Sequence, residues 1–260
     1  MSKIHLLTYA NGEPFESSQN NIIRTIAKCT NLELVIWKYK LSDIIQKPWY
    51  KYIEYLSTTQ NIPSKGRRDG SYNAWKPWLV EEVYSKLDEG DVLYYVDSSQ
   101  HHLDGFSYNI DNLIEAAKHY KQIAGSCHPA ENNITNGVCH NIDVWNFILK
   151  NNCSEYLQKP HILNTWFLFT KNQINDLFIK DWSFYSKQFL NNVPLISYHH
   201  TADQSIFNIL CYKYNLNVFS YDGYMHLDNK NFNSVSKLIN KEKNFSKYFT
   251  SILQINNLYI

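Results

Sequence analysis

The first forty residues alternate between the two hydrophobic periods that distinguish strands from helices. Apolar side chains among polar neighbours predict a strand over residues 4–10, which ends before the turn signal Asn11-Gly12. Apolar positions at helical spacing predict a helix that Ser17 or Ser18 caps and that runs to about Cys29. A second strand follows over residues 34–37. This order of elements predicts the opening of a parallel sheet with crossover helices.

The next part of the chain combines a long polar segment with a helix and a buried strand. Residues 39–71 show no strong period and include the basic, glycine-containing run 64–70, so we expect a long functional loop there. A helix follows from Trp75, with Pro77 in its first turn, and stops at Gly90. Residues 91–96 do not alternate between apolar and polar side chains, which predicts a fully buried strand that ends at Asp97.

The same alternation of helices and strands continues to about residue 220. We expect helices near 110–119, 141–149, 172–178, 181–190 and 203–214, and strands near 122–125, 166–169 and 216–219. The pattern predicts an α/β fold with a mostly parallel sheet flanked by helices, in a single domain over residues 1–230. Residues 231–260 interleave lysines with apolar side chains and predict an amphipathic helical tail packed on that domain. Peripheral contact of this tail with an anionic membrane is the alternative.

Composition and charge narrow the classes of partner. The chain of 260 residues carries 25 Lys and Arg against 24 Asp and Glu, a net charge of +1, and nucleic-acid-binding proteins normally show a clear basic excess. We therefore expect no nucleic-acid partner. The sequence contains no apolar run as long as a membrane span and no signal-peptide core, and its 5 cysteines are scattered. These features predict a soluble, cytoplasmic protein.

Candidate chemistry gathers where the predicted strands end. Ligands of open α/β sheets bind outside the carboxyl ends of the strands, which are here the segments after residue 9 and after residue 96. The second segment delivers Asp97, hydroxyls and imidazoles to the sheet edge. A carboxylate in this position commonly holds magnesium or manganese while substrate phosphates complete the coordination shell. The alternative is that Asp97 only caps the next turn.

Four motifs in one order resemble a known enzyme family. The segment 66–77 reads GRRDGSYNAWKP, a predicted helix follows, and 89–99 reads EGDVLYYVDSS; residues 9–12 read YANG and 200–208 read HTADQSIFN. Together they resemble nucleotide-sugar glycosyltransferases of the GT-A fold, in particular bacterial capsule or lipopolysaccharide-type and viral members. The last segment is also similar to the DQxxLN stretch of glycogenin-like and galactosyltransferase-like enzymes. The resemblance covers most of residues 3 to 220 and implies a GT-A, Rossmann-like sheet.

The resemblance implies roles for particular residues. Those implied to bind the nucleotide sugar are Tyr9, Ala10, Asn11, Arg67, Arg68, Trp75, Lys76, Asp97, Ser98 and Gln204. Asp97 corresponds to the first residue of a DxD-like metal motif, Ser99 stands where the second Asp would be, and His226 is the candidate third ligand. The cofactor implied is Mn²⁺ or Mg²⁺, which would stabilise the charge of the leaving nucleotide diphosphate.

The remaining candidate residues concern the sugars. Asp203 opens a predicted helix and is the candidate catalytic residue, either as a general base toward the acceptor hydroxyl or as a contact of the donor sugar. An ordinary helix cap is the alternative for this residue. Trp166, His199 and His200 are candidates for acceptor binding, although a core position is the alternative for Trp166.

The function expected from the sequence is transfer of a sugar, of the hexosyltransferase type, to a hydroxyl of a glycan or glycolipid. A UDP-sugar is the first expectation for the donor, and both inverting and retaining chemistry stay open. A non-catalytic protein that binds nucleotide sugars or carbohydrates is the competing interpretation. A nucleotidyltransferase ranks last, because residues 13–16 lack the glycine-rich, basic phosphate loop that such an enzyme needs after its first strand.

Overall fold

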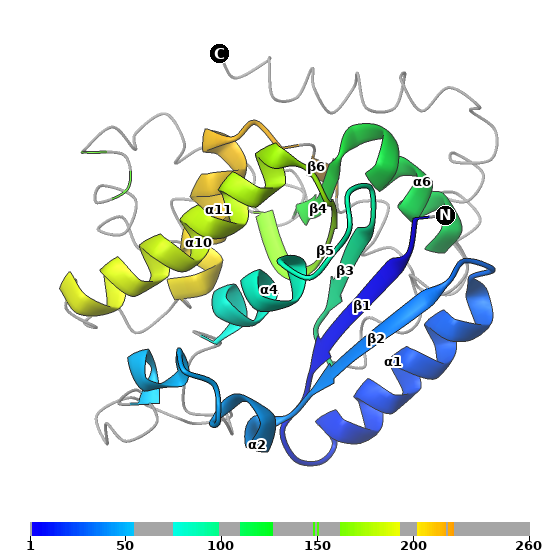
Figure 1. Ribbon diagram of the computed structural model, residues 1–260, viewed down its shortest axis with the longest axis horizontal. Helices are drawn as coiled ribbons and strands as arrows, with labels where there is room; N and C mark the ends of the chain where they lie inside the picture. Colours follow the sequence, from blue (N-terminus) through cyan, green and yellow to red (C-terminus); the bar gives the residue numbers. More distant parts are fainter. Residues whose placement is uncertain are drawn as a thin grey trace.

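A single six-stranded sheet organises the computed structural model of the chain (Figure 1), which describes residues 2–54, 75–98, 110–126, 148, 150, 162–192, 202–216 and 218–220. Across the sheet lie β2 (Leu34–Tyr39), β1 (Ile4–Tyr9), β3 (Val92–Val96), β5 (Ile162–Thr170), β4 (Gln122–Ser126) and β6 (Val218–Ser220). β5 runs antiparallel to both of its neighbours, and every other pairing is parallel. The predicted α/β class with a mostly parallel sheet is therefore confirmed.

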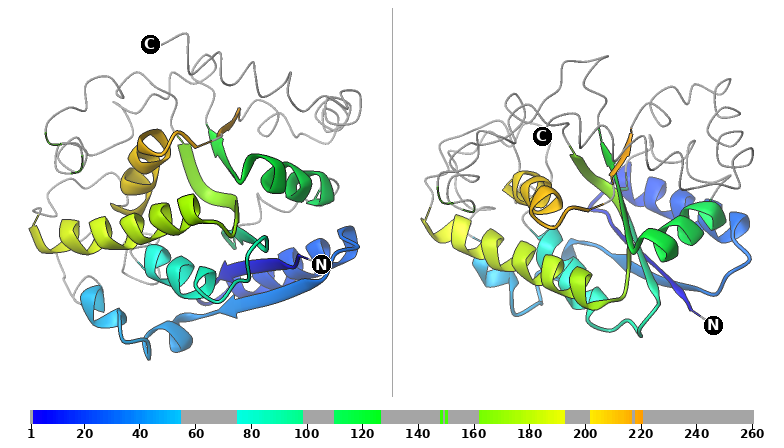
Figure 2. Two further views of the ribbon diagram at one scale, coloured as in Figure 1. Left: turned by 45° about the horizontal axis from the view of Figure 1, so that its top comes forward. Right: turned by 90° about the horizontal axis from the view of Figure 1, so that it is seen from above.

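Helices cover both faces of this sheet. They are α1 (Phe15–Cys29), α2 (Leu41–Ile44), the 3₁₀ turn η1 (Tyr50–Tyr52), α4 (Lys76–Tyr84), α6 (Ile110–Tyr120), α10 (Gln173–Asn192) and α11 (Ala202–Lys213). Figure 2 shows α1 and α6 on one face and α4, α10 and α11 on the other. The predicted alternation of strands and helices is thus the three-layer arrangement that buries both faces of a parallel sheet.

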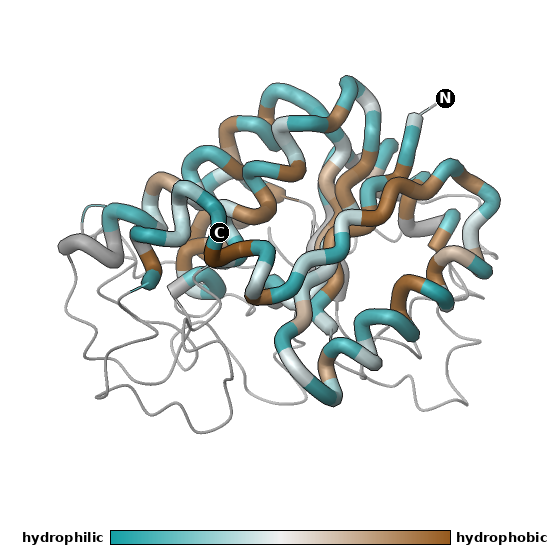
Figure 3. Tube along the Cα trace, turned by 60° about the horizontal axis from the view of Figure 1, so that its bottom comes forward, coloured by the Kyte–Doolittle hydropathy of each residue, from teal (hydrophilic) through white to brown (hydrophobic). Residues whose placement is uncertain are grey.

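Alternate side chains of β3 enter two separate cores. Leu93 and Tyr95 pack with α4, α10 and α11, whereas Val92, Tyr94 and Val96 pack with α1 and α6. All five side chains are buried, and each contributes roughly 1.5–3 kcal/mol by leaving water. In Figure 3 hydrophobic positions follow the central strands, and the helices alternate between hydrophobic and hydrophilic residues. The non-alternating sequence of 91–96 therefore reflects burial on both faces.

Several predicted boundaries were wrong for local reasons. The first helix begins at Phe15, before the predicted cap at Ser17 or Ser18. Of the N–H groups in its first turn, Ser17 N donates to Glu13 Oε2 at 3.4 Å. Just before the helix, Gly12 N donates to Glu16 Oε1 at 2.9 Å. The start of the predicted loop 39–71 contains α2 and η1.

Two further helices differ in extent from the prediction. α4 ends at Tyr84, and tight turns lead on to Gly90, whose φ of +85° suits glycine. The two helices predicted at 172–178 and 181–190 form one continuous α10, because no glycine or proline interrupts the segment. The predicted helix 141–149 falls almost wholly outside the described residues, and the tail 231–260 lies entirely outside them. None of the helices in the described ranges combines the length and apolar character needed to cross a bilayer.

Candidate functional site

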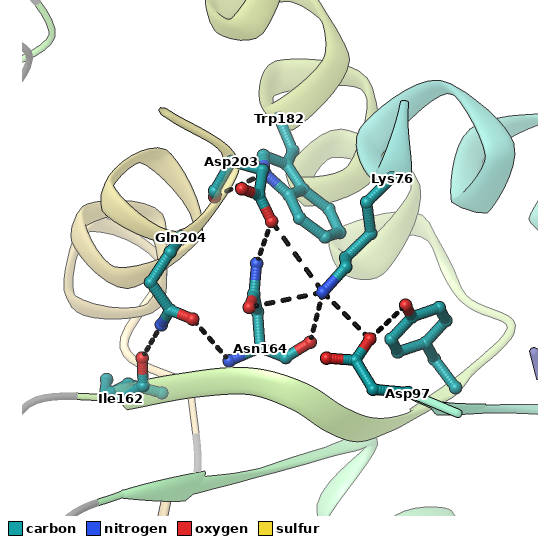
Figure 4. Close-up of polar contacts among 8 residues, drawn as sticks. Lys76, Asp97, Ile162, Asn164, Trp182, Asp203 and Gln204 are labelled. Carbon is teal, nitrogen blue, oxygen red and sulfur yellow. Dashed lines mark hydrogen bonds and ion pairs between the residues drawn. The ribbon is translucent and has the colours of Figure 1, made fainter. Parts of the chain in front are cut away.

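The carboxyl ends of β1 and β3, the start of β5 and the first turns of α4 and α11 meet at one edge of the sheet. Figure 4 shows their polar side chains directed toward one another, with Lys76 at the centre. Lys76 comes from the start of α4, Asp97 follows β3, Asn164 belongs to β5 and Asp203 to α11. Four segments that are far apart in the sequence thus build one polar cluster, which we call the Lys76 cluster.

Lys76 is fully buried and lies between two carboxylates. Its Nζ is 3.1 Å from Asp97 Oδ1 and 3.8 Å from Asp203 Oδ2, and it donates to the Asn164 carbonyl oxygen at 3.2 Å. The ring of Tyr95 lies 5.0 Å from the same Nζ. Removing an ammonium group from water costs several kcal/mol, so this position depends on the surrounding negative charge. Lys76 therefore fixes both carboxylates relative to each other.

Asn164 reaches this cluster because β5 is irregular. Ile162 of β5 pairs with Ser126 of β4, and Phe167 pairs with Ala124. The stretch between these two pairs is therefore longer in β5 than in β4. Side chains of a regular strand alternate between faces, and a bulge changes the face to which a side chain points. Asn164 Nδ2 donates to Asp203 Oδ2 at 2.5 Å, and its Oδ1 is 3.4 Å from Lys76 Nζ. The bulge thus places an amide between the ammonium and a carboxylate.

The first turn of α11 is tied to the same bulge. The Gln204 side chain accepts from Asn164 N at 3.2 Å and donates to the Ile162 carbonyl, to which Asn208 Nδ2 also donates at 3.0 Å. Asp203 lies in the first helical turn, and Trp182 Nε1 donates to its carbonyl oxygen at 3.0 Å. The Asp203 carboxylate is directed to Asn164 and Lys76, so it does more than cap its helix.

Asp97 is the part of the cluster that is open to solvent. Its side chain is 26% exposed, whereas those of Lys76 and Asp203 are essentially buried. Its Oδ1 accepts from the Tyr95 hydroxyl and faces Lys76. Burial, together with the charge of Asp97, raises the pKa of Tyr95 far above its ordinary value, so the hydroxyl stays protonated and donates. Asp97 Oδ2 has no hydrogen-bond partner among the described residues.

An aromatic pair lies at the same edge, where β1 ends and α4 begins. The rings of Tyr9 and Trp75 are 4.1 Å apart between centroids, and both side chains are mostly buried. Ala10 N donates to the Tyr39 carbonyl at 3.0 Å, which holds the segment Ala10-Asn11 at the end of the sheet. Ser98 is buried directly after Asp97. These predicted residues therefore share one edge with the Lys76 cluster.

Trp166 does not line this edge. It is 2% exposed and belongs to the core on the α1 and α6 side of the sheet, with Ile4 and Leu168. Its ring is thus enclosed by core side chains, and the alternative of a core position is the one that the structure shows. Sequence reasoning also missed Asn164, whose signal was a polar amide side chain near the start of a mostly apolar strand.

The other predicted site residues, Arg67, Arg68, Ser99, His199, His200 and His226, lie outside the described residues. Within the ranges that the structure describes, no group of three or more His, Cys, Asp or Glu side chains is arranged to hold a metal ion. Of the three predicted metal ligands, Asp97 is therefore the one that the structure describes.

Comparison with known proteins gives similarity of fold only. No protein-family model matches the chain, and no curated protein matches it. Among solved structures, apo mouse xyloside xylosyltransferase 1 aligns over 84% of both chains with 10% identity and a TM-score of 0.45. A 4-diphosphocytidyl-2C-methyl-D-erythritol synthase from Anaerococcus prevotii aligns over 84% of this chain and 86% of its own, with 14% identity and a TM-score of 0.39. At these identities and TM-scores neither structure assigns a function to the chain.

Proposed function

We propose that the chain is a GT-A-type glycosyltransferase that moves a sugar from a nucleotide diphosphate sugar to a hydroxyl of a glycan or glycolipid. The observation that carries this proposal is the Lys76 cluster at the carboxyl edge of the sheet, where α/β proteins bind their ligands. Carboxylates, an amide and an ammonium in one place suit the many hydroxyls of a sugar. The nucleotide base is assigned to the same edge of the sheet, beside the Tyr9–Trp75 pair, whose rings pack on each other in the core.

Asp203 is assigned to the donor sugar. Its carboxylate is buried and is held by Asn164 and Lys76, and a neighbouring ammonium stabilises the ionised form. A general base needs to reach the proton that it removes and to have an accessible protonated state. The burial and pairing of Asp203 therefore favour a role in orienting the donor sugar by hydrogen bonds over the role of a base.

Asp97 fits one ligand position of the divalent cation that the resemblance implies. Its Oδ1 is fixed by Tyr95 and Lys76. The carboxylate is 26% exposed, and its Oδ2 can coordinate a hard cation such as Mn²⁺ or Mg²⁺. Ser99 and His226 are the further ligands proposed. A bound cation supplies a Lewis acid that stabilises the negative charge developing on the diphosphate.

The competing functions differ in specific features. A nucleotidyltransferase would need the N–H groups around the start of α1 to bind phosphate, but Gly12 N and Ser17 N already donate to Glu16 and Glu13. Two carboxylates at this position repel a phosphate. A non-catalytic relative that binds nucleotide sugars would use the same cluster, so only turnover separates it from the enzyme.

The test is release of nucleotide from a panel of UDP-, GDP-, CDP- and dTDP-sugars with Mn²⁺, with and without simple glycosides as acceptors. We expect at least one donor to be consumed, and Asp97→Asn to lose this activity. Glu33→Gln is the matched control, because Glu33 is an exposed carboxylate that pairs with Lys3 at the other end of β1. Binding of a donor without turnover under every condition favours the non-catalytic relative, and absence of both binding and turnover refutes the proposal.

A further inference from the structure

Tyr95 lies near the end of β3, two residues before Asp97. Its backbone is paired on both sides, with Leu7 of β1 and with Phe167 of β5. Its ring is fully buried, stacks on Phe167 with 5.0 Å between the ring centroids, and lies 5.0 Å from Lys76 Nζ. A ring that is packed in this way has little freedom to move. The Tyr95 hydroxyl therefore has a fixed position at the carboxyl edge of the sheet.

This hydroxyl donates to Oδ1 of Asp97. The main chain of Asp97 is held as well, because its N–H donates to the Thr165 carbonyl oxygen at 2.8 Å. Lys76 Nζ is 3.1 Å from the same Oδ1, and Figure 4 shows this contact at one of the two carboxylate oxygens. Two donors of the protein thus meet one oxygen of Asp97, which leaves Oδ2 to bind a ligand.

The two donors differ in how firmly they orient the carboxylate. Lys76 Nζ is also 3.2 Å from the Asn164 carbonyl oxygen and 3.8 Å from Asp203 Oδ2, so its ammonium is shared among several acceptors. An ammonium is a compact charge with three rotatable donors and imposes little direction. A tyrosine hydroxyl has one proton, and that of Tyr95 is directed to Asp97. Tyr95 is therefore the donor that determines which oxygen of Asp97 turns toward the protein.

We infer that Tyr95 is a positioning residue of the cation site: it holds Asp97 Oδ1 and thereby presents Oδ2 to the divalent cation. This inference rests on the proposed function, in which Asp97 binds Mn²⁺ or Mg²⁺, and adds a residue outside the set predicted from the sequence. Loss of a partner that orients a metal ligand typically weakens metal binding by about 10- to 100-fold. Tyr95→Phe removes this partner and keeps the ring that packs on Phe167.

Binding of Mn²⁺ itself tests the inference. Electron paramagnetic resonance measures free Mn²⁺ in the presence of UDP, or of whichever nucleoside diphosphate binds the parent protein most tightly, with the nucleotide alone as the blank. We expect Tyr95→Phe to bind Mn²⁺ about tenfold or more weakly than the parent protein. The Mn²⁺ concentration for half-maximal nucleotide release should rise by a similar factor, so that turnover falls more at low than at saturating Mn²⁺. A change in Mn²⁺ affinity below about threefold overturns the inference.

Tyr84→Phe is the matched control. Tyr84 is also buried, its ring lies 4.4 Å from Lys171 Nζ, and its hydroxyl donates to the Thr170 carbonyl oxygen at 2.9 Å. Thr170 pairs with Val92 at the start of β3, so this hydroxyl is bonded at the opposite end of the strand. Its loss should lower the stability of the fold and leave the Mn²⁺ affinity unchanged. An equal weakening of Mn²⁺ binding in both variants would show a general effect of a lost hydroxyl and would overturn the inference.

The remaining outcomes separate the inference from the proposed function. If Tyr95→Phe does not fold, Tyr95→Met takes its place with the same expected result, since methionine also lacks the hydroxyl and fills irregular spaces in a core. A parent protein that binds a nucleotide sugar but no Mn²⁺ refutes only the inference. Failure to bind any nucleotide or nucleotide sugar refutes the proposed function itself.

Discussion

Two aspartates flank β3, and the protein uses them in opposite ways. Asp91 precedes the strand at the amino edge of the sheet, and Asp97 follows it at the carboxyl edge. The side chain of Asp91 is 5% exposed and that of Asp97 is 26% exposed. Each faces a basic side chain: His5 for Asp91 and Lys76 for Asp97. The same residue type on the same strand therefore occurs once in a closed environment and once in an open one.

Every polar group around Asp91 has a partner within the protein. Its Oδ1 accepts from Lys3 N at 2.7 Å, and its Oδ2 lies 2.9 Å from His5 Nε2 and accepts from Asp88 N at 3.2 Å. Trp37 Nε1 donates to the other ring nitrogen of His5 at 3.0 Å, which leaves Nε2 as the nitrogen that donates to Asp91. This amino-edge network is saturated and can only stabilise the fold.

The difference shows how a structural carboxylate is distinguished from a functional one. Asp91 is held by backbone N–H groups and the imidazole of His5, and both oxygens are occupied. Asp97 has one oxygen fixed by Tyr95 and Lys76 and the other open toward solvent. A buried anion with complete hydrogen bonding contributes to stability, whereas one that is fixed but incompletely bonded is prepared for a ligand.

The largest effect is expected from removing the cation of the carboxyl edge. Lys76→Met leaves Asp97 and Asp203 close together without their ammonium, which should lower the free energy of unfolding by about 3–5 kcal/mol. Urea denaturation measures this loss. Lys118→Met, which breaks a pair at the surface between the half-buried Lys118 and the exposed Glu115, should change it by less than about 1 kcal/mol. Similar losses in the two variants would contradict the central place of Lys76.

Replacing each aspartate by asparagine distinguishes the role of the carboxyl edge from that of the amino edge. Asp97→Asn should reduce nucleotide release by about 100-fold or more while stability stays close to that of the parent protein. Asp91→Asn should instead cost about 1–3 kcal/mol of stability, because buried hydrogen bonds lose their charged acceptor, and leave turnover per folded molecule unchanged. The comparison fails if Asp91→Asn abolishes turnover in folded protein or if Asp97→Asn only unfolds the chain.

Acid should lower the stability of the amino edge of the sheet by protonating Asp91. Burial alone would raise the pKa of this carboxyl, but hydrogen bonds from Lys3 N, His5 and Asp88 N outweigh it and hold the pKa below its ordinary value of 3.8. A lowered pKa in the folded state gives stability that is present above about pH 3.8 and is lost as the pH falls through the folded value. Denaturation should be measured from about pH 2.5 to about pH 5, roughly one unit on each side of 3.8. The free energy of unfolding should fall less with acid for Asp91→Asn than for the parent protein. An equal loss would exclude Asp91 as a source of acid sensitivity.

The smallest effect is expected from Trp37, which is the second hydrogen-bond partner of His5. Trp37→Phe removes the N–H that donates to His5 Nδ1 and should cost about 1 kcal/mol of stability, since one neutral hydrogen bond is lost. Nucleotide release should not change. A change in turnover would show that the two edges of the sheet are coupled, contrary to the comparison.

The sequence predicts the edge of the sheet better than the cluster that forms there. Asp97 was identifiable because a continuous apolar run ends at it, and Asp203 because it opens a predicted helix beside Gln204. Both signals are local. The burial of Lys76 between these two carboxylates is not a local property. It depends on contacts with Asn164, which is 88 positions away in the chain, and with Asp203, which is further still.

Asn164 shows most clearly what sequence patterns miss. Strict alternation places it on the same face as Trp166, and only the irregular pairing of β5 with β4 brings it to Asp203. β5 itself contains no glycine or proline that would signal a bulge, and the glycine at the irregular pairing, Gly125, belongs to the partner strand β4. For Trp166 the sequence left both a sugar contact and a core position open, and the structure shows the core position.

The most direct test of the central claim is the crystal structure of the chain with the donor found in the nucleotide-sugar panel. The account predicts the transferred sugar within hydrogen-bond distance of Asp97 or Asp203 at the Lys76 cluster, with the base at Tyr9 and Trp75. A donor bound at another edge of the sheet, with the Lys76 cluster unchanged and out of contact, would contradict it.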